Sequence, residues 1–205
     1  MCGRYTLTKQ EGVVEEMQAA MAFELAPRFN VAPTQQAPVV IQRERRTIEM
    51  FRWGLLPKSQ KKPPLMINVR SEGMMDRPLF RDSFRERRCL VPADGFFEWK
   101  AKHPVWFHPT PRRVFAFAGI WLHESFAILT GPPSPLVAPI HDRTPVIIDP
   151  EDYATWLTGD ADAARALIHR QPLDGWAADF VSQRVNSAAN DDPACIAPDP
   201  QGALL

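Results

Sequence analysis

The sequence lacks any long apolar run. Across its 205 residues, nothing approaches the roughly 18 to 20 consecutive apolar residues that a membrane span needs. The first residues reach Arg4 and Lys9 without the apolar core of a signal peptide. We therefore expect a cytoplasmic protein without a membrane partner.

Cysteines and metal-ligand patterns are also scarce. The three cysteines, Cys2, Cys89 and Cys195, are an odd number without a C-x-x-C spacing, so they indicate neither a disulfide framework nor a zinc ribbon. The five histidines show no H-E-x-x-H or similar spacing. We expect reduced thiols, no metal site and no cofactor.

The sequence also carries no net charge, because 24 Lys and Arg balance 24 Asp and Glu. A zero total argues against a general nucleic-acid binder, whose domain is usually strongly basic. The balance is uneven, however: residues 1–120 hold 20 basic against 12 acidic side chains, and residues 121–205 hold 4 against 12. This asymmetry is typical either of a polyanion-binding face or of a solvated charged surface.

Short apolar runs, rich in Val, Ile, Phe and Trp and bounded by Pro, Gly or charged turns, predict β-strands. Helical spacing and start signals predict helices at 8–24, 78–87, 149–157 and 162–170. The predicted strands are residues 38–42, 47–53, 65–69, 89–91, 96–99, 105–107, 114–121, 126–130 and 145–148.

Helices lie between groups of strands without strict alternation of strand and helix. The sequence therefore predicts an α+β fold with a largely antiparallel β-sheet curled toward a barrel and with peripheral helices. The 21 prolines recur between strands and mark no linker, so we expect a single domain over residues 1–190. Residues 191–205, with several Asp and Pro, are predicted to be a disordered tail.

Cys2 is the first candidate for chemistry. Removal of Met1 would leave a terminal residue with a thiol and an α-amine on adjacent carbons, and such an amine has a pKa of roughly 7.7 to 8.0. The amine can attack an aldehyde to form a Schiff base, after which the thiol closes on the same carbon to give a thiazolidine ring. The alternative interpretation is an incidental or buried cysteine.

Residues 66–72 place single polar side chains in an apolar strand. Because side chains alternate along a strand, Asn68, Arg70 and Glu72 share one face, opposite Ile67 and Val69. The sequence therefore predicts one polar face in this segment.

Two further polar groups stand in apolar surroundings. Glu98 lies among aromatic residues, where desolvation should raise its pKa toward general acid-base use. His141 precedes a predicted strand and stands near Arg143, which can hold phosphate. Taken singly, each has a structural alternative, namely a salt-bridged Glu or a hydrogen-bonded His.

Together these segments resemble the SOS-response-associated peptidase (SRAP) family, whose bacterial and eukaryotic members shield abasic sites in single-stranded DNA. The resemblance runs from residue 1 to about residue 190. The matching segments are MCGRY at 1–5, RFNVAPT at 28–34, WGLLP at 53–57, INVRSE at 67–72, RRCLVPADGFFEW at 87–99, AGIW at 118–121 and IHDRTP at 140–145.

The resemblance implies four catalytic residues. The protein would remove its own Met1, and the Cys2 amine would attack the ring-opened C1′ aldehyde of an abasic deoxyribose, forming a thiazolidine crosslink. Glu98 would shuttle protons for Met1 removal and Schiff-base formation. His141 would promote sugar ring opening, and Asn68 would orient the Cys2 amine.

The resemblance also implies the partner, single-stranded DNA with abasic sites, bound by a monomer that joins the bacterial nucleoid at DNA damage. The implied DNA-binding residues are Arg4, Asn30, Arg70, Thr130 and Arg143. Many members carry one or two tryptophans after the WGLLP-like segment, which wedge against bases beside the lesion. Here residues 58–62 are Lys-Ser-Gln-Lys-Lys, which would substitute phosphate contacts for stacking.

Three other functions are compatible with parts of the sequence. A glutamine amidotransferase of the N-terminal-nucleophile class also begins with Cys2, but its glutamine-gripping loop motifs are not apparent. A non-covalent single-stranded nucleic-acid binder would leave Cys2 silent. Peptidase activity on other proteins would need a site that is not built around the protein's own terminus.

Overall fold

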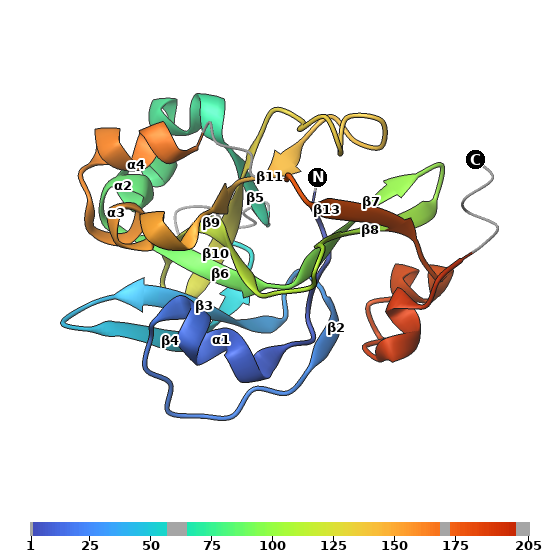
Figure 1. The fold of residues 1–205 in the computed structure, drawn as a ribbon. Helices are drawn as coiled ribbons and strands as arrows, with labels where there is room; N and C mark the ends of the chain where they lie inside the picture. Colours follow the sequence, from blue (N-terminus) through green and yellow to red (C-terminus); the bar gives the residue numbers. More distant parts are fainter. Residues whose placement is uncertain (1, 57–64, 169–172, 200–205) are drawn as a thin grey trace.

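Two β-sheets with short helices around them form the fold of the computed structural model, which describes residues 2–56, 65–168 and 173–199 (Figure 1). Nearly all strand pairings are antiparallel, and the exceptions are those of β10 with β4 and with β5. The predicted α+β class with a largely antiparallel sheet is confirmed.

The larger sheet closes on itself. Its strands follow the order β10, β4, β3, β6 and β9, and β9 pairs again with β10, which completes a ring. The short strands β5, β11 and β12 extend it by pairing with β10 or β9. The bounds are β3 Gln36–Gln42, β4 Arg46–Trp53, β5 Asn68–Arg70, β6 Arg88–Ala93, β9 Phe115–Leu122, β10 Ser125–Gly131, β11 Thr144–Pro145 and β12 Ile147–Ile148.

The smaller sheet has the order β13, β8, β7, β1, β2 and is antiparallel throughout. Its edge strand β13 was not among the predicted strands, because its sequence WAADF has two alanines and an aspartate. Full pairing with β8 makes it a strand. The bounds are β1 Tyr5–Leu7, β2 Arg28–Val31, β7 Gly95–Lys100, β8 His103–Pro109 and β13 Trp176–Phe180.

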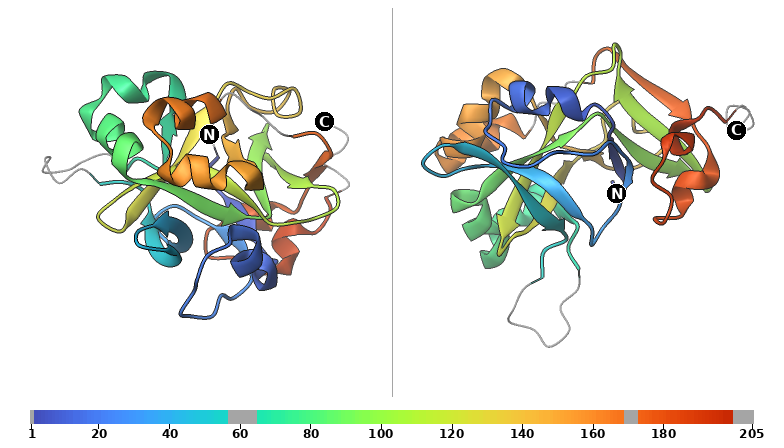
Figure 2. Two further views of the ribbon diagram at one scale, coloured as in Figure 1. Left: turned by 60° about the vertical axis from the view of Figure 1, so that its left-hand side comes forward. Right: turned by 90° about the horizontal axis from the view of Figure 1, so that it is seen from below.

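Helices α2 (Pro78–Glu86), α3 (Tyr153–Thr158) and α4 (Ala161–Leu167) gather at one end of the ring, and residues 183–196 lie at the opposite end beside the smaller sheet (Figures 1 and 2). No helix among the described residues is long and apolar enough to cross a membrane. The 3-10 turns in the described part of the chain are η1 Gln10–Gly12, η2 Ser71–Asp76, η3 Pro150–Asp152, η4 Gln183–Asn186 and η5 Pro193–Ile196.

The predicted helix over residues 8–24 is wrong in its length. Helix α1 covers only Val13–Met17, because Gln18 takes a left-handed conformation with φ 49°. Thr8 does not pair with Glu11 as a capping box would require. Its hydroxyl and its backbone N–H bond the carboxylate of Asp94 at 2.5 and 2.7 Å.

Residues 191–199, predicted to be disordered, lie against the body of the protein. The Asp191 carboxylate accepts hydrogen bonds from the backbone N–H groups of Phe29 (2.6 Å) and Asn30 (2.9 Å) and forms an ion pair with Arg28. Cys195 is fully buried against Val185 and its neighbours. The rest of the predicted tail, residues 200–205, lies outside the described residues.

We expect Asp191→Ala to lower the free energy of unfolding by about 1–3 kcal/mol, because two backbone donors and an arginine lose their shared acceptor. Urea denaturation measures this, with the exposed Asp174→Ala as the control. Equal stability of the two variants would show that this carboxylate does not fasten the C-terminal segment.

Candidate functional site

The pairing of β1 with β7 brings the start of the chain to Glu98. Tyr5 lies opposite Phe96, and the backbone N–H of Phe97 donates to the Arg4 carbonyl at 3.0 Å. In an antiparallel ladder, this register continued by two residues beyond the pair of Tyr5 and Phe96 places Gly3 opposite Glu98. The residue before it, Cys2, therefore enters the same region as the Glu98 carboxylate.

Cys2 is fully buried in the apolar cluster that includes Tyr5 and Trp53. Burial first, and the nearby charge of Glu98 second, raise the pKa of its thiol well above the usual range. The thiol is therefore neutral at pH 7, and its Sγ lies 3.7 Å from the Arg4 carbonyl oxygen that it faces as a donor.

Asn68 holds Cys2 from the side. Its Nδ2 donates to the Cys2 carbonyl oxygen at 2.8 Å. Its Oδ1 is buried and makes no hydrogen bond within the described part of the chain. A buried acceptor without a partner suits a donor that arrives later. The α-amine of Cys2, which removal of Met1 would free, is such a donor.

Glu98 and His141 form the acid-base part of the site. The Glu98 carboxylate is nearly fully buried and lies 3.9 Å from His141 Nε2. Burial raises the pKa of Glu98 to about 7, as its aromatic neighbours predict. A carboxyl group with this pKa can accept and release a proton at neutral pH.

His141 is held in one orientation. The backbone N–H of Arg143 donates to its Nδ1 at 3.0 Å, which requires a lone pair on Nδ1 and so places the proton of the neutral ring on Nε2, toward Glu98. Burial lowers the pKa of His141 from its ordinary value. The exposed Asp142 carboxylate, 3.1 Å from Nδ1, competes for that atom only when Nδ1 carries a proton.

Strand β10 joins the remaining parts of the site. Thr130, fully buried, pairs with Arg70 of β5 on one side and with Pro145 of β11 on the other. The parallel register with β5 also places Asn68 beside Ile128. Segments far apart in sequence therefore meet along one strand.

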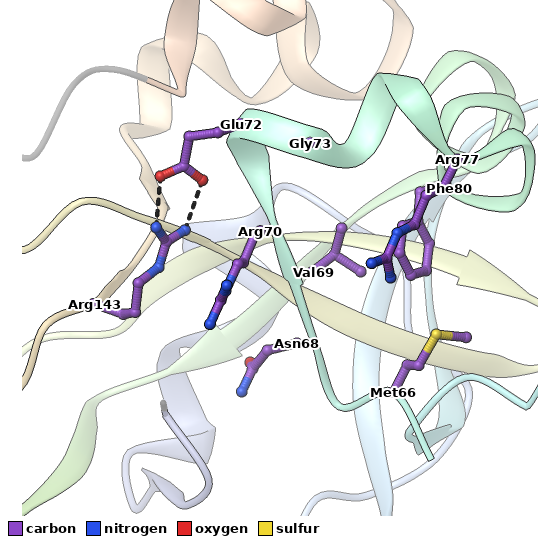
Figure 3. A pocket seen from close by; sticks show the side chains of 9 residues that line it. All are labelled: Met66, Asn68, Val69, Arg70, Glu72, Gly73, Arg77, Phe80 and Arg143. Atoms are coloured by element: carbon purple, nitrogen blue, oxygen red, sulfur yellow. Dashed lines mark hydrogen bonds and ion pairs between the residues drawn. The ribbon is translucent and has the colours of Figure 1, made fainter. Parts of the chain in front are cut away.

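A cavity of about 600 Å³ opens beside this strand (Figure 3). Arg70 extends from β5 toward the side where Arg143 lies, and Phe80 and Met66 form the other wall. The Arg70 guanidinium is exposed and has no hydrogen bond or ion pair among the described residues. The lining residues are Met66, Asn68, Val69, Arg70, Glu72, Gly73, Arg77, Phe80 and Arg143.

The five predicted DNA-binding residues differ in their surroundings, and their roles stay predictions. Arg4 is half-buried and donates to Asn30 Oδ1 (3.2 Å) and to the Val185 carbonyl (2.6 Å). Asn30 is fully buried and fastens residues 185–190 through three backbone carbonyls, so any effect on DNA would act through Arg4. Among these five, Arg70 is the one whose guanidinium has no hydrogen bond or ion pair to the described residues. The lysines predicted to contact phosphates, in residues 58–62, lie outside the described residues.

Two features of the site were not predicted. Glu72 was placed on the face of Asn68 and Arg70 without a partner, but it forms a bidentate ion pair with Arg143, 71 residues away. The Arg77 guanidinium lies 5.8 Å from the centre of the Phe80 ring at the cavity wall. The only sequence signal near this wall of the cavity was the predicted start of a helix at Pro78.

No group of three potential metal ligands occurs in residues 2–56, 65–168 and 173–199.

The chain is similar to proteins of known family. Residues 1–188 match the family described as SOS response associated peptidase (SRAP). The chain is 34% identical to the abasic site processing protein YoqW of Bacillus subtilis, covering 96% of this chain and 99% of that protein. It is 26% identical to YedK of Escherichia coli, an abasic site processing protein, over 97% of this chain and all of that one. A crystal structure from Bacteroides thetaiotaomicron has the same fold, with a TM-score of 0.83 at 21% identity over 97% of this chain and 100% of that one.

Proposed function

Because the chain belongs to the SOS response associated peptidase family, we propose that it processes abasic sites in single-stranded DNA through a covalent bond to its own Cys2. The observation that carries the proposal is the convergence of Asn68, Glu98 and His141 on the start of the chain. A site built around a protein's own terminus suits a reaction in which that terminus is the nucleophile.

The reaction begins with hydrolysis of the Met1–Cys2 peptide bond, which consumes one water and frees the Cys2 amine. The amine then adds to the C1′ aldehyde of the ring-opened sugar, and loss of water gives an imine. Addition of the thiol sulfur to the imine carbon, with its proton passing to the nitrogen, closes the thiazolidine. One aldehyde and one aminothiol therefore yield one ring and one water.

Three side chains assist these steps. Glu98, with its pKa near neutrality, takes a proton from the attacking water and returns one to the departing groups. His141, whose Nε2 lies 3.9 Å from the Glu98 carboxylate, promotes opening of the sugar ring by relaying the proton of the C1′ hydroxyl to the ring oxygen as the bond between C1′ and that oxygen breaks. Asn68 holds the Cys2 carbonyl, and its buried Oδ1 accepts a hydrogen bond from the freed amine.

The proposal is tested with single-stranded DNA that carries one abasic site. Incubation with the purified protein should give a heat-stable adduct, and an undamaged oligonucleotide should give none. The intact mass of the protein should lack Met1. Binding of the DNA without any adduct would contradict the proposal and would indicate a non-covalent single-stranded nucleic-acid binder.

Arg70 supplies a phosphate contact in this proposal. We expect Arg70→Ala to weaken binding to undamaged single-stranded DNA about fivefold at 0.1 M salt and to reduce the salt slope by about 0.7, the value for one phosphate contact. Fluorescence anisotropy across a salt series measures both. Arg43→Ala removes another exposed arginine, paired with Glu49 outside the cavity, and serves as the control. Equal losses in the two variants would refute a specific contact by Arg70.

A further inference from the structure

Glu72 and Arg143, which both line the cavity, form a bidentate ion pair. Arg143 Nη1 donates to one Glu72 carboxylate oxygen at 2.5 Å, and Nη2 donates to the other at 2.8 Å (Figure 3). Hydrogen bonding by Arg143 lowers the pKa of Glu72 to about 2, so this carboxylate is charged at every physiological pH. Protonation of Glu72 therefore does not open the pair at physiological pH.

The pair occupies the part of Arg143 that would bind a phosphate. A guanidinium recognises a phosphate through two parallel N–H groups, and Glu72 takes the two terminal nitrogens. Arg143 Nη2 also donates to the Thr130 carbonyl, and Nε is buried. An incoming phosphate therefore meets a filled fork and can bind Arg143 only where Glu72 leaves.

Glu72 is able to leave, but Arg143 is not. The Glu72 side chain is 51% exposed, whereas that of Arg143 is only 11% exposed and is tied to Thr130. A half-exposed carboxylate can rotate into water, and a phosphate that takes its place restores the charge pairing of Arg143. Exchange of this carboxylate for a phosphate is therefore possible at the same guanidinium.

We propose that Glu72 is a specificity-determining residue that masks Arg143 in the free protein and so weakens binding to undamaged single-stranded DNA. The inference rests on the proposed function, because it takes DNA as the ligand of the cavity. Of the three arginines that line the cavity, Arg70 and Arg77 then remain to attract an intact strand. An abasic strand, in contrast, is retained by its covalent bond after the same weak encounter.

The test compares wild type with Glu72→Gln on an undamaged single-stranded oligonucleotide. At 0.1 M salt, the variant should bind about fivefold tighter, and its salt slope should be steeper by about 0.7, because one more phosphate contact releases counterions. Glu49→Gln is the matched control, since it removes a carboxylate that pairs with Arg43 at 3.1 Å and produces the same change in net charge. In the crosslinking reaction, excess undamaged strand should inhibit Glu72→Gln more than wild type.

An Arg143→Ala background separates masking from a general charge effect. There, Glu72→Gln should tighten binding no more than Glu49→Gln does. Binding by Glu72→Gln that is unchanged relative to Glu49→Gln, or weaker than wild type, would overturn the inference, since a carboxylate that presents Arg143 to DNA would act in that direction. If wild type forms no adduct while Glu72→Gln still tightens binding, the masking holds and the crosslinking proposal fails. If neither protein binds the strand, both are overturned.

Discussion

Cys2→Ala is expected to form no heat-stable adduct with an abasic single-stranded oligonucleotide, whereas wild type converts the strand to a crosslink. The alanine variant still has an α-amine after Met1 removal, so it can form the imine, but it has no sulfur to close the ring. An imine hydrolyses on heating. Cyanoborohydride should therefore rescue an adduct with Cys2→Ala by reducing the imine to a stable amine.

The control for this experiment is Cys89→Ala. Cys89 is also fully buried, lies on β6, and has a thiol whose pKa burial raises in the same way. Cys89→Ala should form the adduct as wild type does, and it should affect only the stability of the fold. An undiminished heat-stable adduct from Cys2→Ala would refute the thiazolidine, and failure of cyanoborohydride to trap that variant would refute the imine before it.

Glu98→Gln is expected to slow Met1 removal by roughly 10²- to 10⁴-fold, the usual contribution of a positioned acid-base group. Glutamine keeps the shape of the side chain but cannot carry a proton between water and the leaving amine. Cell-free synthesis without methionine aminopeptidase, followed by intact mass measurement, follows the loss of Met1. Normal processing by Glu98→Gln, at the rate of the exposed control Glu86→Gln, would show that Glu98 has a different role.

The same variant should change how stability depends on pH. The pKa of Glu98 is about 7 in the fold, against an ordinary value of 4.5, so the folded protein binds the extra proton between these pH values. Wild type therefore loses stability as pH rises from about 4.5 to 7, by roughly 3 kcal/mol in total, and Glu98→Gln lacks this decline. Urea unfolding at a series of pH values measures the slope, with Met1 removed from the variant by methionine aminopeptidase so that the two chains have the same terminus. Equal slopes would contradict the raised pKa.

Most strands of the larger sheet could be predicted because their apolar runs are local signals, whereas β1, β2 and β13 of the smaller sheet were not among the predicted strands. Residues 115–122 and 125–131 are rich in Phe, Ile and Ala, and each is buried along most of its length. The end of α1 at Gln18 could not be predicted, since the apolar spacing continues past it. Strand β13 depends on its pairing with β8, and the order of residues 191–199 depends on Asp191 reaching Phe29 and Asn30 from far along the sequence.

The site likewise combines features that follow from local sequence with features that depend on long-range contacts. The raised pKa of Glu98 follows from the aromatic residues beside it in the sequence, and it was predicted. The ion pair of Glu72 with Arg143 needs the turn after β10 to fold back over β5, and no local pattern indicates that contact. The engagement of Arg4 by Asn30 and Val185 likewise joins three distant segments.

Full burial of Cys2 also bears on how the protein endures the conditions in which DNA loses bases. Peroxides and alkylating agents damage both DNA and proteins, and with cysteine they react through the exposed thiolate. The Cys2 sulfur is neither exposed nor a thiolate, because it is fully buried and its raised pKa keeps it neutral. In the proposed reaction, the sulfur is thereby kept chemically intact until an aldehyde reaches it within the site.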